Sequence, residues 1–150
     1  MITYQREWLS VIKEEVEPLL VMHWEEVGMF DKNRVPLWVD WSKYLFLEEW
    51  GGYLVVTVRD DDKLVGYLGA FITEHMHYNK TKFGMTDVVY VLPEYRKGLL
   101  GVKLISESEQ DMKGLGVRIS ILSFKVDKSM SKIAERLGYS PLDTQHFKEL

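Results

Sequence analysis

A strand–helix–strand pattern in the second half of the chain restricts the fold more than any other sequence feature. Residues 85–92 form an apolar run of strand character that stops at Pro93, residues 98–115 repeat apolar side chains at helical spacing, and residues 117–122 form another β-branched run. Two strands joined through a helix lie parallel in one sheet, with a right-handed crossover. The pattern therefore predicts a sheet with helices packed against it.

The rest of the chain adds helices and a hairpin to this unit. Helical periodicity recurs in residues 5–27, 40–49 and 130–137. Strand character recurs in residues 53–58, 64–78 and 144–148. Pro18 is expected to kink or restart the first helix, and Asp40 is a natural cap for the second.

The predicted element order is α-α-β-β-β-α-β-α-β, without an internal repeat or a linker. A chain of 150 residues is long enough to bury a core as one unit, so we expect a single domain over residues 1–150. The fold class is α/β, with a mixed, mostly antiparallel twisted sheet and helices on both faces.

Composition excludes several classes of protein. The chain has no cysteine, which excludes disulfides, thiolate metal sites and cysteine nucleophiles. A net charge of −4 makes nucleic acid an unfavourable partner. Residues 1–7 do not resemble a signal peptide, and no apolar run approaches the roughly 18 residues of a membrane span. We expect a cytoplasmic protein that does not enter membranes, monomeric or homodimeric.

Charge and tryptophan are distributed unevenly. The first 50 residues contain all five tryptophans together with ten acidic and five basic residues, whereas residues 96–136 contain nine basic and five acidic ones. This asymmetry predicts an acidic, aromatic side for a cationic partner and a basic side for a phosphorylated one.

A short basic turn connects the strand and the helix of the strand–helix–strand unit. Pro93 ends the strand, Arg96 and Lys97 supply positive charge, and Gly98 and Gly101 let a ligand approach the backbone closely. Unpaired backbone N–H groups at the start of a helix favour an anion such as a phosphate or pyrophosphate. The alternative is an ordinary connection whose basic residues are simply solvated.

Two segments of the chain resemble the GNAT superfamily of acyl-CoA-dependent N-acyltransferases. The first is Pro93-Glu94-Tyr95-Arg96 with the glycine loop and helix that follow it, and the second is Glu135-Arg136-Leu137-Gly138-Tyr139. The predicted element order also matches that fold. The resemblance implies acetyl-CoA as cofactor and acetyl transfer to an amine. Because the chain has no cysteine, the transfer would be direct.

Three motifs within this family resemblance are similar to small acetyltransferase-like proteins encoded by tailed bacteriophages. They are His23-Trp24-Glu25-Glu26-Val27, His75-Met76-His77-Tyr78 and Pro93-Glu94-Tyr95-Arg96. This similarity implies a protein that works in the cytoplasm of an infected host. It leaves an alternative open, a non-catalytic interaction protein of the same fold that binds a host protein. Modification of nucleic-acid bases would follow only from this similarity, and the acidic net charge argues against it.

The resemblance also implies a set of cofactor-binding residues. The family loop Arg/Gln-x-x-Gly-x-Gly/Ala aligns with Arg96, Leu99 and Gly101, so Leu99 replaces a glycine and Gly98 is expected to supply the lost freedom. In the family the pantetheine arm pairs with the central strand, and a strand N–H group polarises the thioester. The residues implied are Val89, Tyr90, Val91, Arg96, Lys97, Gly98, Leu99, Leu100, Gly101 and Val102.

Catalytic residues are less defined. Strand alternation over residues 64–78 places His75 and His77 on one face and Glu74 on the other, and His75 is the leading base for the amine, followed by His77 and Glu74. The alternative is that these histidines are merely solvated at a strand end. Asp87 could orient a base or an amine, or could be solvated at a strand edge.

The acid that protonates the departing thiolate is also open. Many family members place a tyrosine where this chain has Ala134, so the role falls to Tyr139, Ser129, Ser131 or water. The His75-x-His77 spacing is also a metal-ligand spacing, with His23, Asp87 or His146 as a third ligand, but we expect no metal.

The acceptor side is predicted in the acidic, tryptophan-rich first third and at the strand end near residue 78. The residues implied are His23, Glu26, Trp38, Trp41 and Tyr78. His23 has an alternative role as a hydrogen-bonded core residue. An acidic rim favours a cationic acceptor, such as a polyamine, an aminoglycoside-like amine or a lysine side chain.

Overall fold

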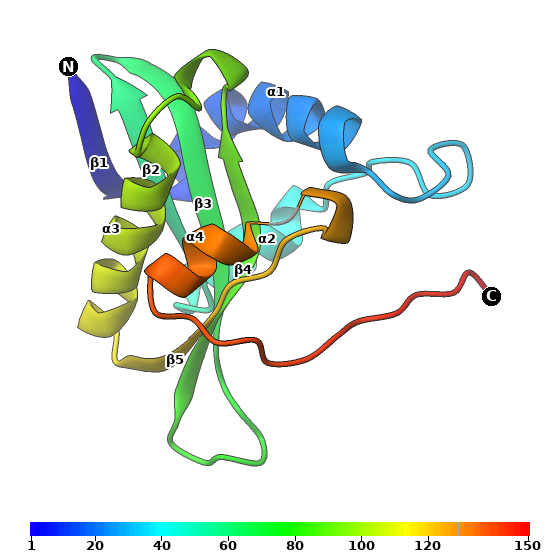
Figure 1. Ribbon diagram of the computed structural model, residues 1–150, viewed down its shortest axis with the longest axis vertical. Coiled ribbons are helices and arrows are strands. Elements are labelled where there is room, and N and C mark those ends of the chain that lie inside the picture. Colours follow the sequence, from blue (N-terminus) through cyan, green and yellow to red (C-terminus); the bar gives the residue numbers. More distant parts are fainter. Residues whose placement is uncertain (129) are drawn as a thin grey trace.

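A five-stranded sheet with the strand order β1-β2-β3-β4-β5 forms the centre of the molecule in the computed structural model, which describes residues 1–128 and 130–150 (Figure 1). The strands are β1 (Ile2–Glu7), β2 (Tyr53–Asp60), β3 (Lys63–Glu74), β4 (Lys82–Val91) and β5 (Val117–Ile121). The first four pair antiparallel, and β5 pairs parallel with β4. The predicted mixed, mostly antiparallel sheet is therefore confirmed.

Helices cover both faces of this sheet. They are α1 (Leu9–Val27), α2 (Trp41–Glu49), α3 (Leu100–Gly114) and α4 (Ser131–Arg136), with 3-10 turns η1 (Pro93–Tyr95) and η2 (Val126–Lys128). Helices α1 and α2 lie on one face, and α3 and α4 lie on the other (Figure 1). The α3 helix is the crossover between β4 and β5, which confirms the strand–helix–strand unit. Within the described residues, no helix is long and apolar enough to cross a membrane.

The predicted element order is wrong at both ends of the chain. Residues 2–7 form strand β1, which pairs with β2 from Ile2↔Asp60 to Glu7↔Val55, so the helix begins at Leu9. Residues 144–148 are not in a strand. The tail instead contacts the segment between α1 and α2, where Arg34 pairs with Glu149 at 2.7 Å and the Phe30 and Phe147 rings lie 5.2 Å apart.

Helix α1 is held on the sheet by an apolar stripe and by a cap from another helix. Leu9, Ile12, Val16 and Leu19 are buried, and the helix continues through Pro18 as one element rather than restarting there. The Glu48 carboxylate in α2, only 5% exposed, accepts the backbone N–H groups of Leu9 and of Ser10. A helix start leaves such N–H groups without partners, and here α2 supplies the acceptor.

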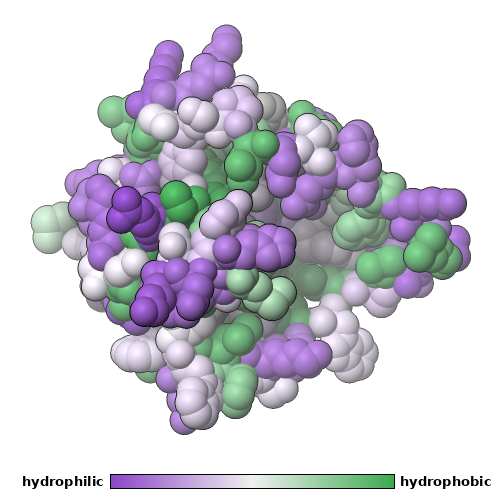
Figure 2. Space-filling model, turned by 90° about the horizontal axis from the view of Figure 1, so that it is seen from below, coloured by the Kyte–Doolittle hydropathy of each residue, from purple (hydrophilic) through white to green (hydrophobic). Residues whose placement is uncertain are grey.

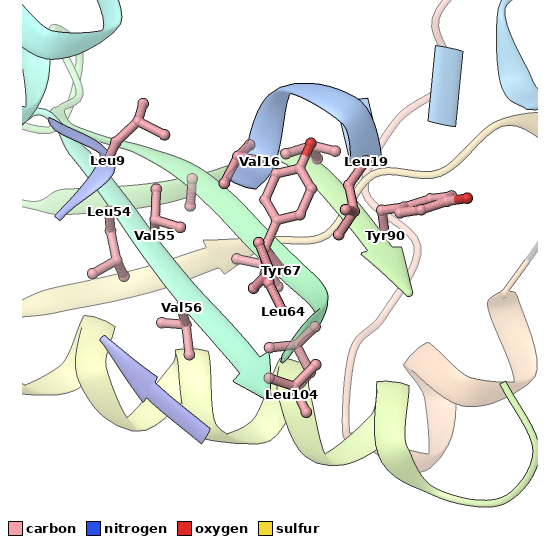
Figure 3. Packing of buried hydrophobic residues seen from close by; sticks show 14 of the residues in the cluster. Leu9, Val16, Leu19, Leu54, Val55, Val56, Leu64, Tyr67, Tyr90 and Leu104 are labelled. Carbon is pink, nitrogen blue, oxygen red and sulfur yellow. The ribbon is translucent and has the colours of Figure 1, made fainter. Parts of the chain in front are cut away.

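The core lies between the helices and both faces of the central strands. Val55, Val58, Val65 and Leu68 are at most 1% exposed. Leu104 of α3 packs on the face of the sheet opposite to Val16 and Leu19 of α1 (Figure 3). Burying one such side chain contributes about 1.5–3 kcal/mol. Strands β2 and β3 are buried on both faces, so they form the rigid part of the sheet against which β4 is placed.

Candidate active site

Strand β4 loses its partner on one side halfway along its length. Its parallel pairing with β5 extends only from Lys82↔Val117 to Met85↔Ile121. The Thr86 hydroxyl donates to the Ile121 carbonyl at 3.0 Å and closes this pairing. The following residues of β4 therefore have an open edge on the β5 side, whereas β3 still pairs with them on the other side.

Hydrogen-bond alternation shows which backbone groups face the open edge. The Leu92 N–H donates to Val65 of β3 at 2.8 Å, whereas the Val91 carbonyl accepts from Arg96 Nε at 2.8 Å on the other side. Because successive residues of a strand alternate, Val89 and Val91 turn their polar groups to the open edge and Tyr90 turns its groups to β3. An extended ligand could pair with Val89 and Val91.

A β-bulge places Asp87 where the open edge begins. Gly69 pairs with Val88 and Ala70 pairs with Thr86, so Asp87 has no partner in the register. Its carboxylate accepts hydrogen bonds from the Tyr44 and Tyr53 hydroxyls, both at 2.9 Å. Asp87 lies in the middle of β4 and remains exposed, so its carboxylate is both oriented and accessible.

Asp87 opens onto a pocket between the sheet and the helices α1 and α2. Its lining residues are Leu9, Val16, Leu20, Trp41, Tyr44, Tyr53, Val55, Tyr67, Asp87 and Val88. Burial, followed by the charge of Asp87, raises the pKa of the Tyr44, Tyr53 and Tyr67 phenols above their ordinary value. The three tyrosines therefore stay protonated at neutral pH, and Tyr44 and Tyr53 act as hydrogen-bond donors to the Asp87 carboxylate.

The turn after β4 presents free backbone donors. The first α3 hydrogen bond runs from the Lys103 N–H to Leu99 at 2.8 Å, so the N–H groups of Leu100, Gly101 and Val102 have no partner within the helix. No side chain caps this end and its first turn has no acidic residue, which makes it suitable for an anion.

The leucine that replaces the family glycine does not obstruct this turn. Leu99 is 75% exposed, and its backbone stays at the helix start. Gly98 adopts φ 89°, a left-handed conformation that favours glycine, so it supplies the turn that the loop needs. A side chain at Gly101 would meet open space, and Lys97 is exposed beside the loop.

Arg96 and Glu26, which the sequence assigned to opposite halves of the site, form a bidentate ion pair. Arg96 Nη1 and Nη2 lie 2.7 and 2.6 Å from the two Glu26 oxygens. The Arg96 guanidinium also lies 5.2 Å from the centre of the Tyr90 ring. Glu26 raises the pKa of Arg96 still further above its ordinary value. Arg96 thus anchors the loop to α1 and to the end of β4 rather than projecting toward a ligand.

His23 belongs to the same cluster. Its ring lies 5.1 Å from the Tyr90 ring, between α1 and β4. Burial lowers the pKa of His23, although the neighbouring Glu26 opposes this effect. His23 therefore packs against Tyr90 between α1 and β4, where burial favours its uncharged form.

The histidines predicted as bases lie at the tip of the β3–β4 hairpin. Strand β3 ends at Glu74 rather than at Tyr78, so the predicted alternation of His75 and His77 on one strand face is wrong. The chain turns instead, with the His77 N–H donating to His75 Nδ1 at 3.1 Å and the His75 ring 4.8 Å from Tyr78.

This tip is remote from the open edge. Lys82, which pairs with Glu74, lies five residues before Asp87, a separation of about 16 Å along a strand. Hydrophilic and hydrophobic side chains are interspersed on the face seen from below (Figure 2). Over residues 1–128 and 130–150, no three His, Asp or Glu side chains are grouped as metal ligands.

Candidate acids for the departing thiolate lie near β5 and α4. The Tyr139 hydroxyl and the Ser120 hydroxyl are 2.9 Å apart, and burial raises the pKa of Tyr139 to about 12. Ala134 is buried in α4, and Ser131 begins that helix. Ser129 lies outside the described residues. Tyr139 is thus protonated and already oriented by β5.

Aromatic residues form the outer wall of the pocket. Trp41 lines it and donates from Nε1 to Glu17 at 3.3 Å. Trp38, 89% exposed, lines an adjoining hollow together with Glu17 and Trp41. Both tryptophans therefore lie at the hollows beside α1 and α2. Tyr44, Tyr53 and Tyr67 were not predicted as site residues. Tyr53 and Tyr67 each place a hydroxyl in a mostly apolar strand, which is the sequence signal that could have identified them.

Comparisons with solved structures agree with the fold described above. The structure is similar to an aminoglycoside acetyltransferase from an uncultured soil metagenomic sample, with a TM-score of 0.76, 14% identity, and coverage of 99% of this chain and 96% of that one. Glucosamine-6-phosphate N-acetyltransferase from Arabidopsis thaliana gives 0.72 and 17%, covering 99% and 98%. A predicted acetyltransferase from Clostridium acetobutylicum, solved with acetyl-CoA, gives 0.69 and 12%, covering 100% and 96%.

At these identities the solved structures establish the fold alone, and the comparison with curated proteins found no match. The sequence itself matches the acetyltransferase (GNAT) family over residues 11–139, which span β4, the basic turn and the segment ending at Tyr139. This match covers most of the chain, including the open strand edge and the uncapped helix start. The protein belongs to the GNAT acetyltransferase family.

Proposed function

We propose that the protein is an acetyl-CoA-dependent N-acetyltransferase that transfers the acetyl group directly to a primary amine. One observation carries the proposal: the open edge of β4 at Val89 and Val91 lies between an uncapped helix start and an oriented carboxylate, Asp87. The aminoglycoside and glucosamine-6-phosphate enzymes with this fold act on amine-bearing acceptors, and the Clostridium structure contains acetyl-CoA.

The cofactor half of the site would be built from backbone groups. The N–H groups of Leu100, Gly101 and Val102 would hold the pyrophosphate, and the exposed Lys97 would add positive charge. Val89 and Val91 would pair with the pantetheine arm, and one of their N–H groups would polarise the thioester carbonyl. Tyr90 would contribute its ring rather than its backbone, since its polar groups face β3. Bound there, acetyl-CoA supplies the acetyl group as a thioester.

The acceptor half would be built on Asp87. Its carboxylate, positioned by Tyr44 and Tyr53, would bind the ammonium group and take the proton that the nitrogen must lose before attack. A C–N bond forms as the C–S bond breaks, and the sulfur leaves with the electrons of that bond. The Tyr139 hydroxyl or water would return a proton to the sulfur. His75, His77 and Glu74 are too far along the hairpin for the role of base.

Calorimetry with acetyl-CoA, followed by thiol release with a panel of amines, tests the proposal. We expect saturable acetyl-CoA binding and amine-dependent release of the thiol. The absence of binding at millimolar acetyl-CoA would overturn the proposal. The predicted cytoplasmic location would be examined separately by fractionating the cells that produce the protein.

A second candidate function is a non-catalytic binding protein on the same fold. The buried Ala134, at the position of the tyrosine that many family members use, favours this candidate. For such a binding protein, the resemblance of the three motifs to phage-encoded proteins would make a host protein the partner. Tight acetyl-CoA binding without thiol release across the amine panel would support this second function and exclude the first.

A further inference from the structure

The Tyr67 hydroxyl is an unsatisfied polar group at the wall of the acceptor pocket. Tyr67 is 2% exposed, and its hydroxyl has no hydrogen-bond partner within the described part of the chain. The ring projects from β3 toward α1, near Val16 and Leu19 (Figure 3). Buried hydroxyls without partners are rare because their desolvation is uncompensated, so this one requires a ligand or a water molecule.

The pocket that contains this hydroxyl also contains a single carboxylate. Apart from Asp87 and the tyrosine hydroxyls, its walls are apolar or aromatic, including Leu9, Val55 and Val88. Tyr44 and Tyr53 each donate one hydrogen bond to Asp87, and a carboxylate can accept about four. An ammonium group has three donors, which Asp87 and the Tyr67 oxygen could accept together.

A second carboxylate lies in the adjoining hollow. This hollow is lined by Glu17, Val21, Leu37, Trp38 and Val39, and it shares Leu20 and Trp41 with the first pocket. Trp41 holds Glu17 through one carboxylate oxygen. Trp38 is 89% exposed, so its indole face is available to a cation beside Glu17. A carboxylate next to an aromatic face is suited to a second ammonium group.

The apolar wall shared by the two pockets determines what can connect two such groups. Leu20 and Trp41 offer no charged partner to the middle of a ligand, so methylene groups fit this stretch better than polar ones. Resting on the proposed function, we propose that the acceptor is an unbranched α,ω-diamine. Its reacting nitrogen binds at Asp87 and Tyr67, its methylenes cross Leu20 and Trp41, and its distal ammonium binds at Glu17 and Trp38.

Steady-state kinetics with matched amines tests this proposal. The substrates are n-alkylmonoamines and α,ω-diamines of equal chain length, assayed with wild type, Glu17→Gln and the control Glu14→Gln, whose side chain is on the same helix but lines neither hollow. We expect wild type to prefer the diamine by about tenfold in kcat/KM, a preference that Glu17→Gln abolishes through KM. Equal kcat/KM for both amines in wild type would overturn the proposal.

The substitution Tyr67→Phe removes the hydroxyl and keeps the ring, so it tests the role of the hydroxyl alone. We expect it to raise KM for monoamine and diamine alike, with an unchanged melting temperature. An unchanged KM would show that the hydroxyl is satisfied by water only and would remove Tyr67 from the proposal.

Amine binding can be measured without turnover through the fluorescence of Trp38 and Trp41. This measurement distinguishes failure of the diamine proposal from failure of the acetyltransferase proposal. Diamine binding that depends on Glu17 but occurs without thiol release would overturn the acetyltransferase function and leave the diamine site intact. Turnover of monoamines with no preference for diamines would do the reverse.

Discussion

The two ends of strand β4 differ in pairing and in chemistry. At the end near Lys82, β4 has a strand on each side, and the hairpin beyond it ends in a cluster of His75, His77 and Tyr78 that packs on Phe83 of β4. At the other end, the pairing with β5 has stopped, and a bulge orients Asp87 among tyrosines. The difference places an oriented carboxylate, rather than the histidine cluster, beside the part of β4 whose backbone hydrogen-bonding groups are left unpaired.

Asp87→Asn should lower catalytic activity more than any other substitution. Unchanged activity would contradict the conclusion that the open end of β4 and its hairpin end differ in chemistry. We expect kcat/KM at neutral pH to fall about 100-fold or more, because general base catalysis contributes on this scale. Acetyl-CoA affinity, measured by calorimetry, should not change. His75→Ala is the matched variant at the opposite end of β4, and its kcat/KM should stay within about twofold of wild type. A large loss of activity in His75→Ala together with a small loss in Asp87→Asn would instead assign the role of general base to the hairpin.

Arg96→Ala should have a smaller effect, on both stability and cofactor affinity. The guanidinium holds Glu26 and the Val91 carbonyl, and its side chain is 39% exposed, so we expect a loss of about 1 kcal/mol in unfolding free energy after screening. The loosened turn should raise the Kd for acetyl-CoA by about tenfold.

Arg96→Lys should rescue this loss poorly, because a lysine cannot form the bidentate pair. Arg34→Ala, which breaks an exposed ion pair with Glu149, is the control and should leave the Kd unchanged. Chemical denaturation and calorimetry provide both quantities. A Kd that depends on Arg34 and not on Arg96 would contradict the anchoring role.

His23, which packs at the open end of β4, should make the stability of the protein depend on pH. Burial lowers its pKa in the folded state, so the unfolded chain binds the proton more readily. The contribution of His23 to stability is therefore complete above its unfolded pKa of 6.5 and is lost as pH falls below that value. Denaturation midpoints compared between pH 7.5 and pH 5.5 should decrease in wild type and decrease less in His23→Gln. The exposed His77→Gln is the control and should follow wild type.

Leu99→Gly should have the smallest effect. Restoring the family glycine keeps the backbone N–H and removes a side chain that is already 75% exposed. We expect the Kd for acetyl-CoA to change by less than about twofold, since Gly98 already provides the left-handed turn. Gly98→Ala, measured alongside, should weaken binding more than Leu99→Gly does. The opposite order would show that Leu99 distorts the loop.

The same two regions show what sequence reasoning can reach. The segment around Pro93, Gly98 and the start of α3 was predicted because each of its features is local: a strand stop, a glycine turn and a helix start. Strand β1 was missed because residues 2–7 are too short and too mixed in polarity to show a period, and only their pairing with β2 defines them.

The errors at the site have the same physical origin. The hairpin tip depends on where β3 stops, which the turn around Lys80, at φ 65°, determines rather than the alternation of the strand. The bulge at Asp87 arises from register with β3, and the Arg96–Glu26 pair joins residues 70 positions apart. The composition of the chain reveals the asymmetry between an acidic, tryptophan-rich side and a basic turn. It does not reveal which charged side chains are already paired with one another in the folded protein.

The carboxylate of Glu48 links the folding of two helices that a ligand would enter between. Because the first turn of α1 depends on an acceptor in α2, the amides of Leu9 and Ser10 can exchange with solvent only when α2 separates from α1. We therefore expect the two helices to open together, with the pocket wall that contains Val16, Trp41 and Tyr44 formed or lost in the same step. Occupancy of the pocket should thus be measurable as slower exchange of the Leu9 and Ser10 amides at the start of α1.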